Sequence, residues 1–164
     1  MNDLQTRLLV ILDAEESLYG RLRDSLQEER EVVARLDAAG LEEIARLKEE
    51  LSDEGRLLEE SRRCVADELA ASLGMPAGSR LGAICDRIGA SAEPLAAAQQ
   101  RLSILVSVVR ELLEANVLLA GESLSEVRST LRLIGGLAAE PATYQPDRLG
   151  TAPAEAGRLV RRSA

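Results

Sequence analysis

The sequence predicts an all-α protein: an elongated antiparallel bundle of three long helices, with a short extra helix in the linker and a flexible C-terminal tail. Apolar residues recur every three or four positions over long stretches, as they do along one face of a helix. Glycine and proline gather at a few boundaries between those stretches, where turns are expected. The apolar residues are almost all Leu, Ala, Val and Ile, which favours an aliphatic core. We therefore expect a helical bundle over residues 1–137 and a flexible tail over residues 138–164.

The first helix is expected over about residues 3–37. Gly20 lies inside it at a cost of about 1 kcal/mol relative to alanine, so we expect local flexibility or a close helix contact there. Gly40 stands where a C-terminal cap would sit, which predicts a tight turn near residues 38–40. The apolar positions fall at spacings of four, three or seven and form one stripe: Leu8, Leu12, Tyr19, Leu22, Leu26, Val33 and Leu36.

The second helix is expected over about residues 41–72, antiparallel to the first. A single helix running through Gly40 is the alternative, but it would be about 100 Å long with no partner of matching length. Residues 24–60 carry 13 acidic and 5 basic side chains and so account for the net charge of −8. Such a segment argues against nucleic acid or an anionic membrane as partner. We interpret it as a solvated face; selection of a basic partner is the alternative. The apolar stripe is Leu41, Ile44, Leu47, Leu51, Leu58, Val65 and Leu69.

The stretch SLGMPAGSR, residues 72–80, breaks the periodicity and reads as a linker. A short helix is expected over residues 80–88, closed by Gly89. Ser91 is a candidate N-cap for the last long helix, since serine is favoured at that position. Pro94 would then lie in the first turn of the helix, where proline is tolerated. That helix is expected over about residues 93–135, ending at Gly135 and Gly136.

The last long helix carries the candidate binding surface. In residues 102–113 the apolar side chains cover an arc of about 200°, so we expect contact with both arms of the hairpin; a further partner is the alternative. Asn116 places an amide in the aliphatic stripe, which predicts that it fixes the register of the core. Beyond Asn116 the helix carries a further apolar face, and of all the apolar faces in the sequence it has the fewest remaining residues that could pack against it. It is formed by Leu119, Leu124, Val127, Leu131 and Ile134.

The composition excludes several kinds of function. There is no histidine, so no imidazole can serve as general base or metal ligand. Lys48, the only lysine, lies in a charged stretch that reads as a solvated face, so we expect no enzyme, cofactor or metal. Cys64 and Cys85 have no CxxC spacing and are expected to be free thiols. The apolar run LLVIL is too short for a signal peptide or a membrane span, so we expect a cytoplasmic protein without direct membrane insertion.

Three stretches resemble the FlgN family of flagellar export chaperones. The block ELLEANVLLAGESLSEVRSTLRLI is similar to a helix of that family, and EEREVVARLDAAGLEEIARLKEEL is similar to its charged hairpin. The tail PATYQPDRLG resembles the family's motif after the last helix, a tyrosine followed closely by Pro or Asp and Gly. The family often has Gly directly after this tyrosine, where this chain has Gln145-Pro146-Asp147.

The resemblance implies a cytoplasmic type III secretion chaperone. It would hold the hook-associated proteins FlgK and FlgL by an amphipathic C-terminal segment and deliver them to the export gate protein FlhA. The client would bind the apolar face from Leu119 to Ile134, and Tyr144 would dock on the gate. Folding of Tyr144 back onto the helical bundle is the alternative. Two alternatives stay open: a self-assembling coiled-coil protein that forms a homodimer through residues 102–113, and a chaperone for a different type III substrate.

Overall fold

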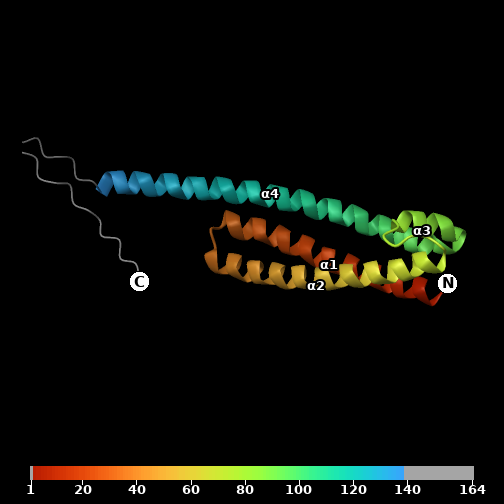
Figure 1. Cartoon of the computed structure of the whole chain (residues 1–164). Helices are drawn as coiled ribbons and strands as arrows, with labels where there is room; N and C mark the ends of the chain where they lie inside the picture. Colours follow the sequence, from red (N-terminus) through yellow and green to blue (C-terminus); the bar gives the residue numbers. More distant parts are fainter. Residues whose placement is uncertain (1, 139–164) are drawn as a thin grey trace, which may run out of the picture. The chain divides into compact units, whose positions relative to one another are not determined.

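The structure is a computed structural model that describes residues 2–138 (Figure 1). Within these residues all regular structure is helical, which confirms the all-α prediction. The chain divides into two compact units, residues 1–128 and residues 129–164, and the arrangement described below is that of the first unit. The predicted tail, with Tyr144, lies outside the described residues. The elements are α1 (Asp3–Ala34), α2 (Ala38–Ser72), α3 (Leu81–Ile88), a 3-10 helix η1 (Gly89–Ala92) and α4 (Glu93–Ala138).

The turn between α1 and α2 lies earlier than the sequence predicted. Leu36 adopts a left-handed conformation with φ 55°, and Asp37 caps α2 by accepting a hydrogen bond from the Gly40 amide at 3.0 Å. The prediction that Gly40 ends a helix is therefore wrong, because Gly40 belongs to the first turn of α2. A Cβ atom at Gly40 would lie 2.8 Å from Asp37 Oδ2 and 3.0 Å from Val32 Cγ1. The glycine is needed here for close approach, and not for helix termination.

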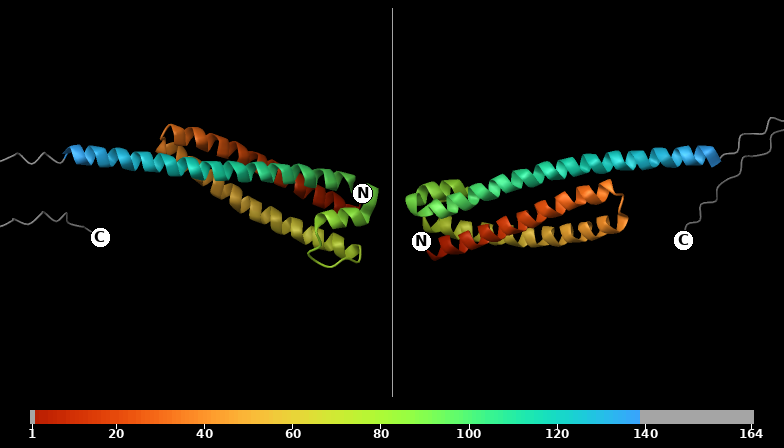
Figure 2. Two further views of the ribbon diagram at one scale, coloured as in Figure 1. Left: turned by 90° about the horizontal axis from the view of Figure 1, so that it is seen from above. Right: turned by 180° about the vertical axis from the view of Figure 1, so that it is seen from behind.

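Helices α1 and α2 form the predicted antiparallel hairpin (Figure 2). Leu36, the last residue of the first stripe, is 63% exposed because it lies in the turn. At Gly20 nothing lies within 4 Å of the position that a Cβ atom would occupy, so the expected close helix contact there is wrong. Most of the predicted stripe residues are buried: Leu8, Leu12, Leu26 and Val33 on α1, and Ile44, Leu51, Val65 and Leu69 on α2.

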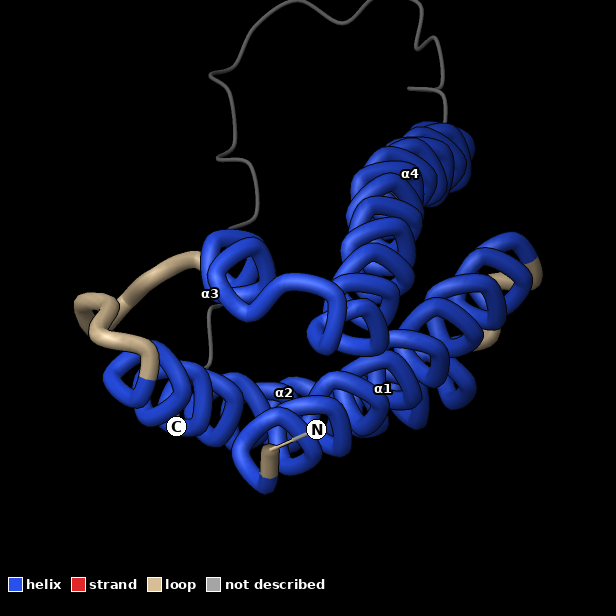
Figure 3. The backbone as a smooth tube through the Cα atoms, turned by 90° about the vertical axis from the view of Figure 1, so that its right-hand side faces the viewer, coloured by secondary structure: helices blue, strands red, loops and turns tan. Residues whose placement is uncertain are grey.

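One end of the hairpin is covered by α3, η1 and the start of α4 (Figure 3). Gly89 closes α3 with φ 78°, as predicted. Ser91 lies inside η1, which leads directly into α4, so the prediction that it caps a helix is wrong. α4 also continues through Gly135 and Gly136 to Ala138. All five helical elements contribute to one buried cluster: Leu8, Leu12, Val65, Leu69, Ala70, Ile84, Cys85, Ala92, Leu95 and Ala98.

The two cysteines occupy contrasting environments, which makes them probes of this end of the fold. Cys64 is exposed on α2, whereas Cys85 is buried in the cluster under α3. Burial, with a smaller contribution from the charge of Asp86, raises the pKa of the Cys85 thiol above its usual value. Because the thiolate is the reactive form, a thiol reagent should modify Cys64 quickly and Cys85 only slowly. We expect one fast-reacting thiol in the native protein and two in denaturant; two fast thiols in the native protein would contradict the packing of α3.

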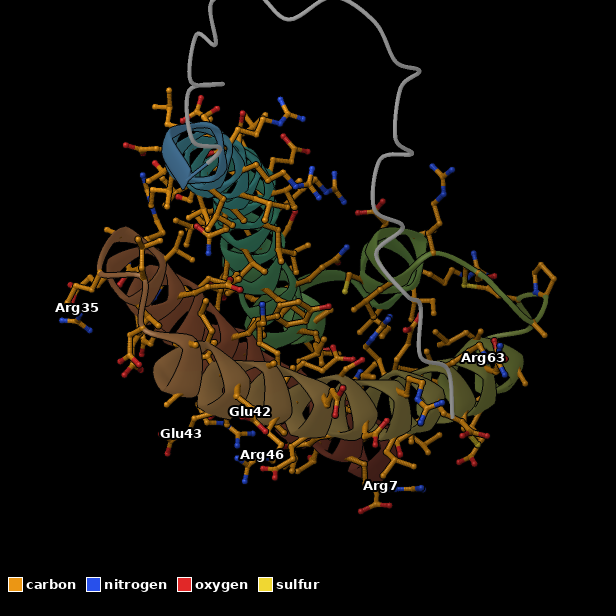
Figure 4. The ribbon with its side chains drawn as sticks, turned by 90° about the vertical axis from the view of Figure 1, so that its left-hand side faces the viewer. Arg7, Arg35, Glu42, Glu43, Arg46 and Arg63 are labelled. Atoms are coloured by element: carbon orange, nitrogen blue, oxygen red, sulfur yellow. The ribbon has the colours of Figure 1, made fainter. Side chains whose placement is uncertain are left out.

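The acidic middle of the chain forms the outer surface of the hairpin, as the sequence suggested. Figure 4 shows Arg35, Glu43 and Arg46 directed away from the helices. Of the acidic residues between positions 24 and 60, Glu29 is the one that is not exposed. Glu29 therefore needs a separate explanation.

Candidate functional site

α4 runs parallel to α1 in a register defined by side-chain contacts. Arg101 donates to Glu16 from Nε at 3.0 Å and to Asp13 from Nη2 at 3.3 Å. Further along, Asn116 Nδ2 donates to the backbone oxygen of Leu26 at 2.8 Å. The partners in these contacts are 85, 88 and 90 positions apart in the chain. The same separations place the end of α1, at Ala34, level with about residues 119–124 of α4.

A chain of polar contacts joins the three long helices near that level. Lys48 on α2 forms an ion pair with Glu29 Oε1 on α1. The other oxygen of Glu29, Oε2, accepts a hydrogen bond from Asn116 Nδ2 on α4 at 2.8 Å. The interpretation of Lys48 as part of a solvated face is therefore wrong, since its side chain is 28% exposed and paired. Asn116 is 6% exposed, and its Oδ1 is buried without a hydrogen-bond partner in the described structure.

A second ion pair between α1 and α2 lies closer to the end of the bundle that α3 covers. Glu15 on α1 is 5% exposed, and Arg62 Nε on α2 donates to its Oε1 at 2.9 Å. The sequence contains a signal for both pairs that the periodicity argument missed. The stripe on the first helix has a spacing of seven residues at two points, and Glu15 and Glu29 lie in those two intervals. Arg62 likewise falls in a seven-residue gap of the second stripe, and Lys48 lies between two of its leucines.

Beyond its first turns, α4 is only partly covered by the hairpin. Leu95 and Ala98 are buried, but after them Val109 is the only buried apolar side chain among the described residues of α4. Leu102, Leu105, Val106 and Leu112 are half-buried. Ile104 is 60% exposed and Leu113 41%. Contact with both arms of the hairpin therefore does not bury the whole apolar arc of residues 102–113.

Most of the predicted binding residues lie exposed on α4. Leu119 is half-buried, at the level where α1 ends. Leu124 is 51% exposed and Val127 36%. Leu131 and Ile134, which belong to the second unit, are 62% and 57% exposed and continue the same spacing along the helix.

Two further side chains extend this surface, and the sequence analysis missed them. Leu113 is 41% exposed and Val117 72%, and they precede Leu124 by eleven and seven residues. At 100° per residue, Leu113, Val117 and Leu124 lie within about 40° of one another around the helix axis. This spacing in the sequence indicates that the three residues share one face of the helix. Because residues 102–113 were expected to pack against the hairpin, Leu113 and Val117 were not included among the predicted binding residues. We call Leu113, Val117, Leu124 and Val127 the α4 apolar face.

A second apolar depression lies between α1 and α2. It has a volume of about 660 Å³ and is lined by the apolar or thiol side chains of Val10, Ile11, Leu57, Cys64 and Val65 and by the polar side chains of Thr6, Arg7, Glu60 and Ser61. No group of three or more acidic or cysteine side chains in residues 2–134 is arranged to hold a metal ion. None of the helices in the described part of the chain is long and apolar enough to cross a membrane.

The comparison with protein families agrees with the resemblance noted in the sequence. No curated protein and no solved structure matches the chain. The sequence model of the FlgN family, described as FlgN protein, matches residues 1–149 and thus includes every helix described above. The chain therefore belongs to the FlgN family of flagellar export chaperones.

Proposed function

We propose that this flagellar export chaperone holds the hook-associated proteins FlgK and FlgL by their C-terminal amphipathic segments and delivers them to FlhA at the export gate. The observation that supports client binding at α4 is the exposure of its apolar face, with Leu124 at 51% and Val117 at 72%. This face begins beside the hairpin and continues past the level where α1 ends. We place the client on these residues, together with Leu119, Leu131 and Ile134.

An amphipathic client helix suits this surface for a simple energetic reason. Burying a leucine or valine side chain contributes about 1.5–3 kcal/mol when burial is complete. A client segment that is disordered when free uses part of that energy for its own ordering. Binding of one helix along the face is therefore firm enough to prevent premature assembly of the client, yet remains reversible at the gate.

The test is calorimetric titration of the full chain with C-terminal segments of hook-associated proteins from the same genome. We expect saturable one-to-one binding to these segments. The C-terminal segment of flagellin is the control and should give no heat of binding. Absence of binding to every segment, with a protein shown to be folded and helical by circular dichroism, would contradict the proposal.

Self-association of the free chaperone is a second candidate use of α4. Ile104 is 60% exposed and Val108 37%, and both lie in the segment for which the sequence suggested a homodimer. Sedimentation velocity over a range of concentrations tests this. A client-free dimer that becomes a one-to-one complex on client addition supports a dimer that protects the face; a monomer at all concentrations rules it out.

We propose that Tyr144, outside the described residues, docks on FlhA. Replacing Tyr144 by alanine should leave the client affinity unchanged and weaken binding to the cytoplasmic part of FlhA by at least tenfold, because an aromatic anchor is lost. The Tyr144→Phe variant keeps the ring and separates its role from that of the hydroxyl group. An equal loss of client affinity in Tyr144→Ala would contradict separate docking and client sites.

We also propose that Asn116 fixes the register between α4 and α1. In an Asn116→Leu variant the loss of its two hydrogen bonds should allow alternative registers, because leucine packs against an aliphatic stripe at several levels. A shift of one heptad moves α4 by about 10 Å. Spin labels at the exposed Ser17 and Ser103, with both native cysteines replaced by alanine, should then give a broadened distance distribution. Ser123→Leu, a change at another half-buried polar position of α4, is the control and should leave the distribution narrow.

A further inference from the structure

The α4 apolar face has a basic border along one side. At 100° per residue, Arg110 and Arg128 project from the same direction, directly beside Val117 and Leu124. Glu122 and Glu126 project from the opposite side of the helix, each about 160° around the axis from Leu124. The face therefore has a basic border, and these two acidic side chains point away from it.

Contacts within the described structure do not account for these charges. Arg110, Arg128, Glu122 and Glu126 are all exposed, and none of them forms an ion pair with another described residue. On the hairpin, by contrast, exposed charges do pair, for example Arg21 with Glu54. Arg110 and Arg128 thus have no ionic partner among residues 2–134.

The order of the charges in residues 122–132 of α4 also gives no support to the helix itself. Glu122 and Glu126 are four residues apart, as are Arg128 and Arg132. Like charges at this spacing destabilise an isolated helix by a few tenths of a kcal/mol, whereas an alternating order would stabilise it. The observed order places Arg128 on the basic border and Glu122 and Glu126 on the opposite side of the helix, which suits a partner that brings acidic side chains to the basic border.

We propose that the client segment is an amphipathic helix with acidic side chains along one edge, facing Arg110 and Arg128. This inference rests on the proposed function and specifies the partner of the same face. Reversing the direction of a bound helix exchanges its two edges, so the charge pattern selects one binding direction. Arg110 and Arg128 are about 27 Å apart along the axis, so the client helix spans about 18 residues.

Charge reversal on the basic border tests the inference. The full chain with Arg110→Glu and Arg128→Glu is titrated against the C-terminal segments of hook-associated proteins that bind the unchanged protein. We expect at least a tenfold loss of affinity at about 50 mM salt and a smaller loss at about 500 mM, because salt screens exposed charges. A client segment whose acidic edge is changed to arginine should recover the affinity for the doubly changed chaperone.

The matched control carries Arg46→Glu and Arg63→Glu, the same change of net charge at two exposed arginines of α2 (Figure 4). It should leave the affinity within about twofold of the unchanged protein, since surface charges away from the site act only at long range. An equal loss in both double variants would reduce the effect to net charge and overturn the inference, as would unchanged affinity in the Arg110 and Arg128 variant. A loss of self-association with unchanged client affinity would assign the basic border to a second copy of the chain and overturn the inference too. If the unchanged protein binds no client segment, the proposed function itself fails.

Discussion

Replacing Leu95 by alanine should lower the free energy of unfolding by about 3 kcal/mol, within the range observed for buried leucines that leave a cavity. Leu95 is fully buried at the start of α4, in the cluster to which α1, α2, α3 and η1 also contribute. Its loss removes contacts between α4 and the rest of the bundle at the point where α4 is most deeply packed. The measurement is urea unfolding followed by circular dichroism at 222 nm.

The control for this variant is Leu57→Ala. Leu57 is 66% exposed on α2, so the same chemical change there should cost less than about 1 kcal/mol. If the two substitutions lowered the free energy of unfolding equally, packing of Leu95 in the buried cluster would not be what holds α4 on the hairpin. The comparison also bears on function, because further along α4 only Val109 and Asn116 are buried among the described residues. The first turns of α4 are therefore expected to supply most of the energy that holds the helix on the hairpin.

The helices of this protein were predictable because their apolar periodicity is long and nearly uninterrupted. The turn between α1 and α2 was predicted too late in the sequence. Gly40 was interpreted as the end of a helix, whereas the capping residue Asp37 decides where α2 begins. Asp37 accepts a hydrogen bond from the Gly40 amide and so starts α2 before the glycine is reached. The left-handed residue of this turn is Leu36, an unfavourable choice for a leucine that no propensity rule anticipates.

The partly buried ion pairs between α1 and α2 show how much a periodic pattern can conceal. Glu15 and Glu29 occupy positions of the apolar stripe on α1, and Glu29 also belongs to the acidic segment of residues 24–60 that was interpreted as a solvated face. Only the pairing of α1 with α2 reveals that Arg62 and Lys48 lie opposite them. A buried carboxylate left without its partner is strongly destabilising, so these pairs restrict which registers of the hairpin are acceptable.

The candidate site was predictable in part for the same reason. The exposed positions Leu124, Val127, Leu131 and Ile134 follow from a helix that carries an apolar stripe with little chain left to cover it. Val117 was missed because the depth to which α4 packs on the hairpin depends on the contacts of Arg101 and Asn116, which are separated from their partners by 85 to 90 positions. Contacts at such separations have no local signature in the sequence.

Replacing Leu124 by aspartate should reduce the affinity for a hook-associated client segment more than tenfold, equivalent to more than about 1.4 kcal/mol. Leu124 is 51% exposed at the centre of the α4 apolar face, so a client helix that covers the face would bury the new carboxylate against apolar groups. The Leu131→Asp variant should behave in the same way, since Leu131 is 62% exposed and lies seven residues further along. Both changes are expected to leave the helical circular dichroism signal unaltered, because neither side chain is buried in the free protein.

The decisive comparison is with Leu118→Asp on the same helix. Leu118 is 69% exposed but points away from the α4 apolar face, about 120° around the axis from Leu124. The same substitution there adds the same charge to the same helix and should leave client affinity within about twofold of the unchanged protein, as expected for a surface change outside a binding site. A tenfold loss at Leu124 without a loss at Leu118 can be explained only by contact on one face of α4. Equal losses of affinity at both positions would point to a general effect of charge or helix stability. Unchanged affinity at both positions would place the client on another surface, and the apolar depression between α1 and α2 beside Val10 and Leu57 is the first one to test.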